Sequence, residues 1–189
     1  MFRSQYSRVA LLTFLASTLP ALAQAKPLHL VPDSAKTEFI GIGRPALLKV
    51  KGQAKEMAAA IDMTDGTVSG EFKVPLENLD SGIELRDEHM KNKYLAVGQF
   101  PEAILKVDSL KVDASKDRKA IPFTGTLTLH GVAKPVTGEA QVEARETRYA
   151  VDAKFNIKLS EYGIDIPRYA GITFADNVDI NVRFEADSK

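Results

Sequence analysis

The sequence predicts an all-β protein in which eight or more antiparallel strands close into a barrel that carries a single helix. Apolar and polar side chains alternate with a period of two over most of the chain from about Lys36. Short turns separate the alternating segments, and only the stretch from Glu84 to Pro101 has helical spacing. A two-sheet sandwich is the main alternative. Closure is favoured because a barrel leaves no exposed strand edges, and eight strands enclose packed side chains or one small ligand.

The strands are expected at residues 36–43, 47–52, 58–63, 68–74, 103–108, 123–129, 136–144, 149–159 and 178–185. Asp65-Gly66 and His130-Gly131 have the composition of tight hairpin turns. The polar segment Asp113 to Lys119 is predicted to be a loop. Each strand has one apolar and one polar face, as expected for a sheet with a dry interior and a wet exterior.

The helix is predicted to begin after Asp80 and Ser81, whose side chains are good N-caps. Arg86, Met90 and Tyr94 follow at intervals of four residues and share one face. We expect the helix to end near Gly98, ahead of Pro101. A lone helix in a chain of strands is expected to cover one end of the barrel.

Residues 1–23 have the pattern of a cleaved signal peptide: Arg3 and Arg8, then the apolar run from Val9 to Leu22, then the small-residue site Ala21-Leu22-Ala23. We therefore expect export to the periplasm, cleavage near Ala23, one domain over residues 24–189 and no stable membrane insertion. Cleavage leaves 23 basic and 25 acidic residues, a charge of −2 that argues against a nucleic-acid partner. The sequence has no cysteine, which excludes disulfides, thiolate metal sites and a cysteine nucleophile.

Arg86, Asp87 and His89 are the residues that most resemble a catalytic cluster, with His89 as a base oriented by Asp87. Residues two apart on a helix point in different directions, which disfavours that arrangement. Arg86 and His89 are therefore predicted to anchor the helix or to contact a ligand head group. The three histidines, at 29, 89 and 130, do not form a metal-binding set. No catalytic residue, metal or cofactor is predicted.

The apolar faces have two interpretations, an ordinary filled core or the wall of a ligand cavity. Small residues on these faces, including Gly125, Gly138, Ala140 and Ala153, favour the cavity because packed interiors leave little free space. The predicted ligand-binding residues are Phe39, Phe72, Arg86, His89, Met90, Tyr94, Leu105, Phe123, Leu127, Leu129, Tyr149, Phe155, Ile157, Val182 and Phe184.

Three motifs in order resemble those of one known family. Arg86-Asp87-x-His89-Met90 is followed by Tyr94-Leu95 and the exit Phe100-Pro101; Gly125 to Val136 reads GTLTLHGVAKPV; Ser160 to Ile164 and Val178 to Ala186 resemble the closing strands. On these motifs the chain from about Lys36 resembles the YceI-like family of exported, lipocalin-like proteins.

The resemblance implies an extended eight-stranded barrel that holds a long apolar molecule, a polyisoprenoid, a quinone-like lipid or a fatty amide, and it suggests a homodimer. We therefore expect a periplasmic binding protein for storage, transport or stress protection, with the ligand's polar end near the helix or a mouth loop such as Tyr162 to Thr173. The alternatives are an enzyme that acts on such a lipid through Arg86, Asp87 and His89, or a filled barrel with a structural or interaction role.

Overall fold

The computed structural model describes residues 24–44, 48–112, 120–169 and 172–188. The predicted signal peptide and the predicted loop from Asp113 to Lys119 lie outside these residues. The strands are β1 (Lys26–Leu30), β2 (Lys36–Arg44), β3 (Lys49–Ala54), β4 (Ala58–Thr64), β5 (Thr67–Pro75), β6 (Glu102–Lys111), β7 (Ile121–Leu129), β8 (Val132–Arg145), β9 (Arg148–Lys158), β10 (Arg168–Tyr169) and β11 (Ile172–Asp187).

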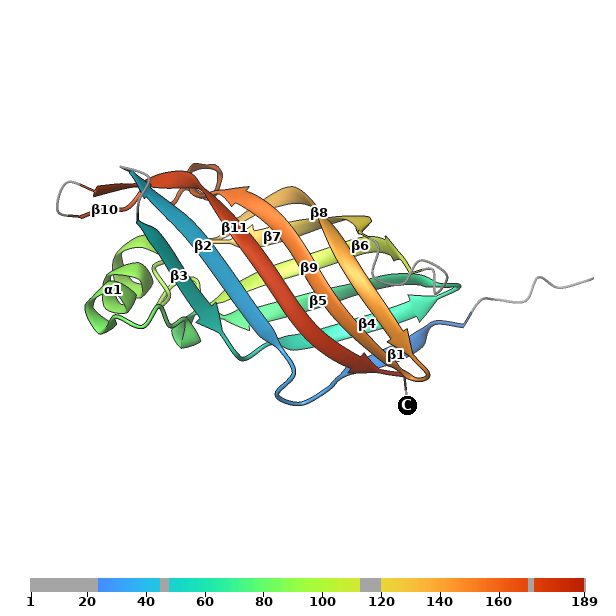
Figure 1. Ribbon diagram of the computed structural model, residues 1–189. Helices are drawn as coiled ribbons and strands as arrows, with labels where there is room; N and C mark the ends of the chain where they lie inside the picture. Colours follow the sequence, from blue (N-terminus) through green and yellow to red (C-terminus); the bar gives the residue numbers. More distant parts are fainter. Residues whose placement is uncertain (1–23, 45–47, 113–119, 170–171, 189) are drawn as a thin grey trace, which may run out of the picture.

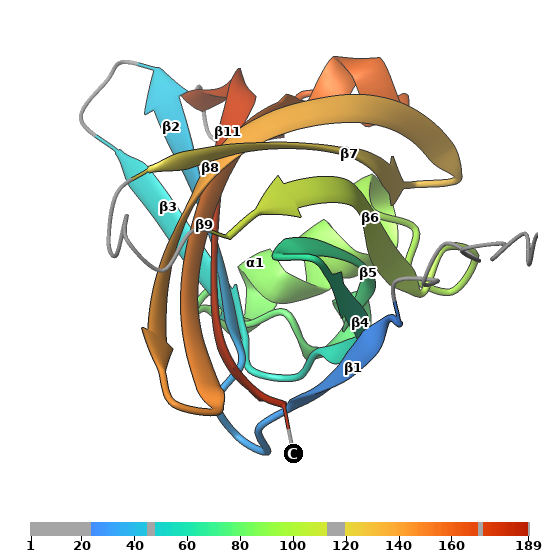
Figure 2. The same cartoon turned by 90° about the vertical axis from the view of Figure 1, so that its right-hand side faces the viewer.

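The sheet closes into the predicted eight-stranded antiparallel barrel. Neighbouring strands follow the order β1-β4-β5-β6-β7-β8-β9-β11, and β1 returns to pair with β11 through His29↔Asp187 and Leu30↔Ala186. β2 pairs with the same edge of β11 further along that strand, and β3 pairs with β2. Figure 1 shows the long strands winding obliquely around the barrel, and Figure 2 shows them as a ring seen from one end.

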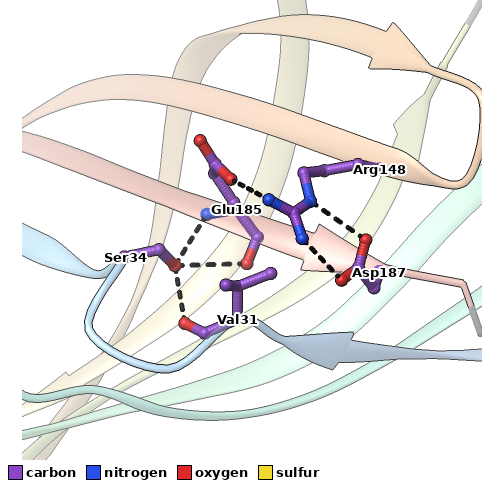
Figure 3. Close-up of polar contacts among 5 residues, drawn as sticks. All are labelled: Val31, Ser34, Arg148, Glu185 and Asp187. Atoms are coloured by element: carbon purple, nitrogen blue, oxygen red, sulfur yellow. Dashed lines mark hydrogen bonds and ion pairs between the residues drawn. The ribbon is translucent and has the colours of Figure 1, made fainter.

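Ser34 joins β1 and β2 into one interrupted strand along β11 (Figure 3). Its hydroxyl donates to the Val31 carbonyl (2.7 Å) and accepts from the Glu185 amide (3.0 Å), while the Val31 amide bonds to the Glu185 carbonyl (2.9 Å). Close by, Arg148 forms exposed ion pairs with Glu185 and Asp187. The side-chain bonds of Ser34 replace the ladder bonds that are lost where the chain kinks, so both halves stay on the β11 edge.

Both predicted hairpin turns are confirmed. Asp65 and Gly66 have φ values of 49° and 73°, and His130 and Gly131 have φ values of 51° and 74°. Two consecutive left-handed residues are the pattern of the turn that matches the twist of a tight hairpin. These turns set the registers of β4 with β5 and of β7 with β8.

The helix is shorter than predicted and is capped differently. α1 (Glu84–His89) has Ile83 at the N-cap, with no side-chain cap bond, so the expected capping by Asp80 and Ser81 is wrong. A single π-helical turn, η2 (Met90–Tyr94), extends α1. The chain then leaves the helix at Ala96, not near Gly98: Ala96 has a φ of 46°, and the Val97 amide bonds to the Lys91 carbonyl (3.0 Å). This six-residue bond satisfies a helix carbonyl that would otherwise lack a partner.

Among the described residues, two short 3-10 helices, η1 (Leu76–Asn78) and η4 (Leu159–Tyr162), accompany the strands and α1. The expectation that Ser160 to Ile164 is extended is therefore wrong, because η4 occupies most of this segment. Asp176 holds the turn by accepting bonds from the Ser160 amide (2.8 Å) and hydroxyl (2.6 Å). These bonds also keep the pKa of the Asp176 carboxyl below its ordinary value.

The helix lies at one end of the barrel, as predicted. α1 and β10 lie at the same end, opposite β1 (Figure 1), and in Figure 2 α1 is seen across the interior at the far end. A backbone bridge between Gln53 of β3 and Asp80 ties the segment before α1 to the barrel wall. The segment that leads into the helix is thus fixed to β3.

Candidate ligand-binding cavity

The barrel encloses a cavity of about 610 Å³. Its wall is formed by the inward-facing residues of the strands. Along β11, for example, Val178, Ile180, Val182, Phe184 and Ala186 all line it, with the period of two expected of a strand. The lining is apolar over almost its whole extent. The barrel is therefore hollow, which disfavours the alternative of a filled core.

All fifteen predicted ligand-binding residues lie on the cavity wall. They are Phe39, Phe72, Arg86, His89, Met90, Tyr94, Leu105, Phe123, Leu127, Leu129, Tyr149, Phe155, Ile157, Val182 and Phe184. Alternation predicted the strand residues correctly because every strand places one face inward. Direct contact between these side chains and a ligand stays a prediction.

The sequence interpretation missed several lining residues near the helix end. Val50 lies on β3 and Leu48 lies just before this strand. Both follow the alternation of β3, so they could have been included among the predicted lining residues. At the start of β11, both Phe174 and Ala175 line the cavity because a bulge between Phe174 and Val178 shifts the register. Arg168 also lines the cavity, but no periodic pattern surrounds this residue in the sequence.

Gly125 and Gly138 do not provide the free space that was expected of them. A Cβ atom on Gly138 would lie 2.6 Å from the Phe123 ring, and one on Gly125 would lie 2.4 Å from the Lys106 carbonyl oxygen. Both glycines are therefore part of tight packing. Ala140 and Ala153, in contrast, do line the cavity.

The end of the cavity near β1 is closed by packed side chains. Leu28, Ala35, Ile61, Phe184 and Ala186 form a buried cluster there. The rings of Phe72 on β5 and Phe184 on β11 meet with centroids 5.3 Å apart, although their strands are not neighbours in the sheet. Contact across the barrel narrows the interior at this end.

The opposite end is open. The lining residues with exposed side chains are Leu48, Ile83, Leu85, His89 and Arg168. Leu48 is 43 % exposed, and Ile83 and Leu85 are each 53 % exposed. They come from the start of β3, from α1 and its N-cap, and from β10, which lie together at one end of the barrel in Figure 1. The cavity therefore opens beside the helix.

Arg86 anchors the helix to the segment that precedes it. Its Nε donates to the Ser81 hydroxyl (2.7 Å) and its Nη2 donates to the Ser81 carbonyl (2.6 Å). Asp87 accepts bonds from the Ser81 amide (3.0 Å) and hydroxyl. Because Asp80 is bridged to β3, these bonds connect α1 to the wall of the barrel. Asp87 binds Ser81 and not His89, so the arrangement of an oriented histidine base is not formed.

The other two histidines lie outside the cavity lining. His130 Nδ1 is 3.1 Å from the Tyr162 carbonyl oxygen, and its ring packs edge-on against Phe100 with centroids 4.7 Å apart. His130 thus fastens the β7–β8 turn to η4. His29 is exposed on β1. Among the described residues, no group of three His, Cys, Asp or Glu side chains is arranged to hold a metal ion.

Within the described ranges, no helix has the length and hydropathy of a membrane span.

A closed antiparallel barrel around an apolar cavity that opens beside a helix is typical of barrel proteins that bind a ligand in their interior. Within that class, the chain belongs to the YceI-like family, whose domain model matches residues 30–186.

Curated relatives include UPF0312 protein YE1254 of Yersinia enterocolitica and Protein YceI of Salmonella arizonae. Each is 33 % identical over 94 residues, which is 46 % of this chain and 47 % of the relative. The matched region thus spans about half the length of these relatives.

Solved structures show the same fold. BcnA of Burkholderia cenocepacia has a TM-score of 0.68 at 17 % identity, over 80 % of this chain and 95 % of BcnA. A polyisoprenoid-binding domain from Saccharophagus degradans has a TM-score of 0.67 at 16 % identity, over 87 % and 99 %. The YceI protein of Campylobacter jejuni has a TM-score of 0.59 at 19 % identity, over 76 % and 87 %.

Proposed function

We propose that the protein binds one long-chain apolar amphiphile, with the chain in the barrel and the polar end at the opening beside α1. The observation that carries this proposal is the apolar cavity of about 610 Å³. This volume lies within the range of about 300–1,000 Å³ that is usual for small-molecule sites. An empty cavity of about 150 Å³ with a hydrocarbon lining already binds benzene, so the interior here is several times larger than a minimal apolar site.

The energetics favour a long chain. Burial of each methylene is worth about 0.8 kcal/mol, so ten methylenes supply about 8 kcal/mol before the cost of ordering the ligand. Such binding needs no catalytic group. The similar barrel from Saccharophagus degradans is described as polyisoprenoid-binding, which supports a polyisoprenoid, a quinone-like lipid or a fatty amide as the ligand class.

The alternative of an enzyme that acts on such a lipid rests on Arg86, Asp87 and His89. The bonds of Arg86 and Asp87 to Ser81 favour an anchoring role for the first two residues. We therefore favour binding over catalysis. A ligand recovered from the protein in chemically unchanged form is the expected result, and turnover of that ligand would favour the enzyme.

Native mass spectrometry of the purified protein, followed by lipid extraction, tests the proposal. We expect a complex with one apolar molecule per chain, which disappears after delipidation. Repeated failure to recover any lipid, together with failure of the delipidated protein to bind apolar probes, would contradict the proposal.

The proposed setting is the periplasm, where the protein would store or carry the amphiphile or protect it under stress. This part rests on the signal-peptide pattern of residues 1–23. Sequencing of the exported protein should give an N-terminus at Gln24. A chain that retains residues 1–23 in the cytoplasm would refute this setting.

A further inference from the structure

The ionisable side chains that line the cavity are basic, apart from two tyrosines. Among the described residues, Arg86, His89 and Arg168 line it, and no aspartate or glutamate does. The protein as a whole has equal numbers of acidic and basic residues, so composition alone does not account for this selection. The cavity therefore presents positive charge, or neutral donors, to whatever occupies it.

These three residues lie at the open end. Arg86 and His89 are three residues apart on α1, which places them on one side of the helix. Arg168 begins β10, which lies at the same end of the barrel as α1 (Figure 1). His89 and Arg168 are exposed, Arg86 is half-buried, and most of the remaining lining is apolar. The apolar interior, which suits a hydrocarbon chain, is thus separated along the barrel from the basic opening, which suits a polar head group.

The three basic side chains differ in how many hydrogen bonds and ion pairs they make within the protein. Arg86 donates two bonds to Ser81. Within the part of the chain that the structure describes, the side chains of Arg168 and His89 make no hydrogen bond or ion pair, although their backbones belong to β10 and α1. The acids of α1 do not compensate them across the cavity: Asp87 is bonded to Ser81, and Glu84 and Glu88 are exposed and outside the lining.

We propose that the amphiphile has an acidic head group, a carboxylate or a phosphate monoester, held at the opening by Arg168, with His89 as a second donor at the same end of the cavity. This inference rests on the proposed function. The guanidinium of arginine matches the geometry of both anions with two parallel donors, and such charge-assisted bonds are about twice as strong as neutral ones. A neutral head group would gain no charge-assisted bond from this guanidinium, which would remain solvated by water.

Matched ligands with one chain length test the head group. Dodecanoate, dodecyl phosphate and dodecanol compete with the neutral dye N-phenyl-1-naphthylamine for the delipidated protein, below their micelle concentrations. Both anions should bind at least about tenfold more tightly than the alcohol. Inorganic phosphate should not displace the dye or compete with dodecyl phosphate, because it has no chain to bury.

Arg168→Gln assigns the effect to one residue. This variant should weaken dodecanoate about fivefold and change dodecanol by less than about twofold. Lys106→Gln is the matched control, since Lys106 is an exposed residue of β6 outside the lining, and it should change neither ligand. Thermal melting and dye affinity should match those of the unmodified protein, which reports an intact fold.

The outcomes separate the two proposals. If no dodecyl ligand displaces the dye and the dye itself does not bind, the proposed function fails. If alcohol and acid bind equally, or if Arg168→Gln weakens both to the same extent, the head-group inference is overturned while the proposed function stands. Competition by inorganic phosphate alone would instead reveal a free phosphate site and would also overturn the inference.

Discussion

Gly125 occupies a position where any side chain would collide with the neighbouring strand. A Cβ atom there would lie 2.4 Å from the Lys106 carbonyl oxygen on β6. The register of β6 with β7 shifts next to this position, between Val107 and Ser109. The glycine therefore allows the barrel wall to bend, in keeping with the role of glycine at bulges and bends.

Gly125→Ala is expected to destabilise the protein by about 1–3 kcal/mol, because the colliding atom belongs to the backbone and cannot rotate away. Chemical denaturation followed by circular dichroism measures this change. Gly98→Ala is the control, since a Cβ atom at Gly98 has no neighbour within 4 Å and this glycine does not have a positive φ. Equal stabilities of the two variants would refute the steric explanation.

At the scale of single residues, the sequence predicted the cavity wall well where strands alternate. Leu105, Leu127 and Phe155 were placed correctly because successive side chains of a strand alternate between its two faces. Once one inward-facing residue is known, every second residue of that strand also faces inward. Arg168 could not be placed in this way. It begins a two-residue strand whose position depends on its pairing with Thr173 and Ile172 of β11, and local periodicity does not encode that pairing.

At the scale of elements, the helical segment is the one whose prediction needed most correction. Its existence and its place at one end of the barrel were predicted, but its boundaries were not. The start at Ile83 depends on the long-range bridge between Gln53 and Asp80 and on the bonds that Ser81 donates to Asp87. The end depends on Ala96 adopting a left-handed conformation that glycine would adopt more readily. A tertiary contact therefore overrode the local signal at the start of the helix, and local backbone conformation set its end.

The helix should matter to binding mainly through its apolar side chains. Met90 and Tyr94 line the cavity and pack against the main core cluster. Replacing both with alanine should weaken dodecanol binding at least about tenfold, because substantial apolar contact is lost. Dye displacement measures this affinity.

His89→Ala provides the comparison for the Met90 and Tyr94 double variant. Its effect on the neutral alcohol should be smaller, because an exposed imidazole at the opening buries little of the chain. A greater loss in His89→Ala than in the double variant would reopen the catalytic interpretation of the Arg86, Asp87 and His89 cluster.

At the scale of the whole molecule, closure was predicted from strand number and alternation. The way in which the barrel closes was not predicted. β1 was missed because it is five residues long and includes Pro27, and its pairing with both β4 and β11 completes the ring. The break after β1 depends on Ser34, whose role is visible only once Glu185 lies beside it. Residues about 150 positions apart determine this joint.

Filling part of the interior should weaken ligand binding without unfolding the barrel. Ala153 lines the cavity, so Ala153→Phe places a ring in the space proposed for the ligand chain. We expect at least about tenfold weaker dodecanol binding and a modest change in melting temperature. Lys154→Phe adds the same ring at the next, exposed position of β9 and should preserve binding. Equal binding by both variants would contradict an internal site.

The opening beside α1 also affects how fast a bound ligand leaves. A chain that enters tail first must withdraw along the same path, because the end near β1 is closed by the packed cluster of Leu28, Ile61 and Phe184. If each methylene must leave apolar surroundings before release, every added methylene lengthens the residence time roughly fourfold. A barrel with this shape releases short chains quickly and retains long ones, so the length of the ligand's chain would set its residence time.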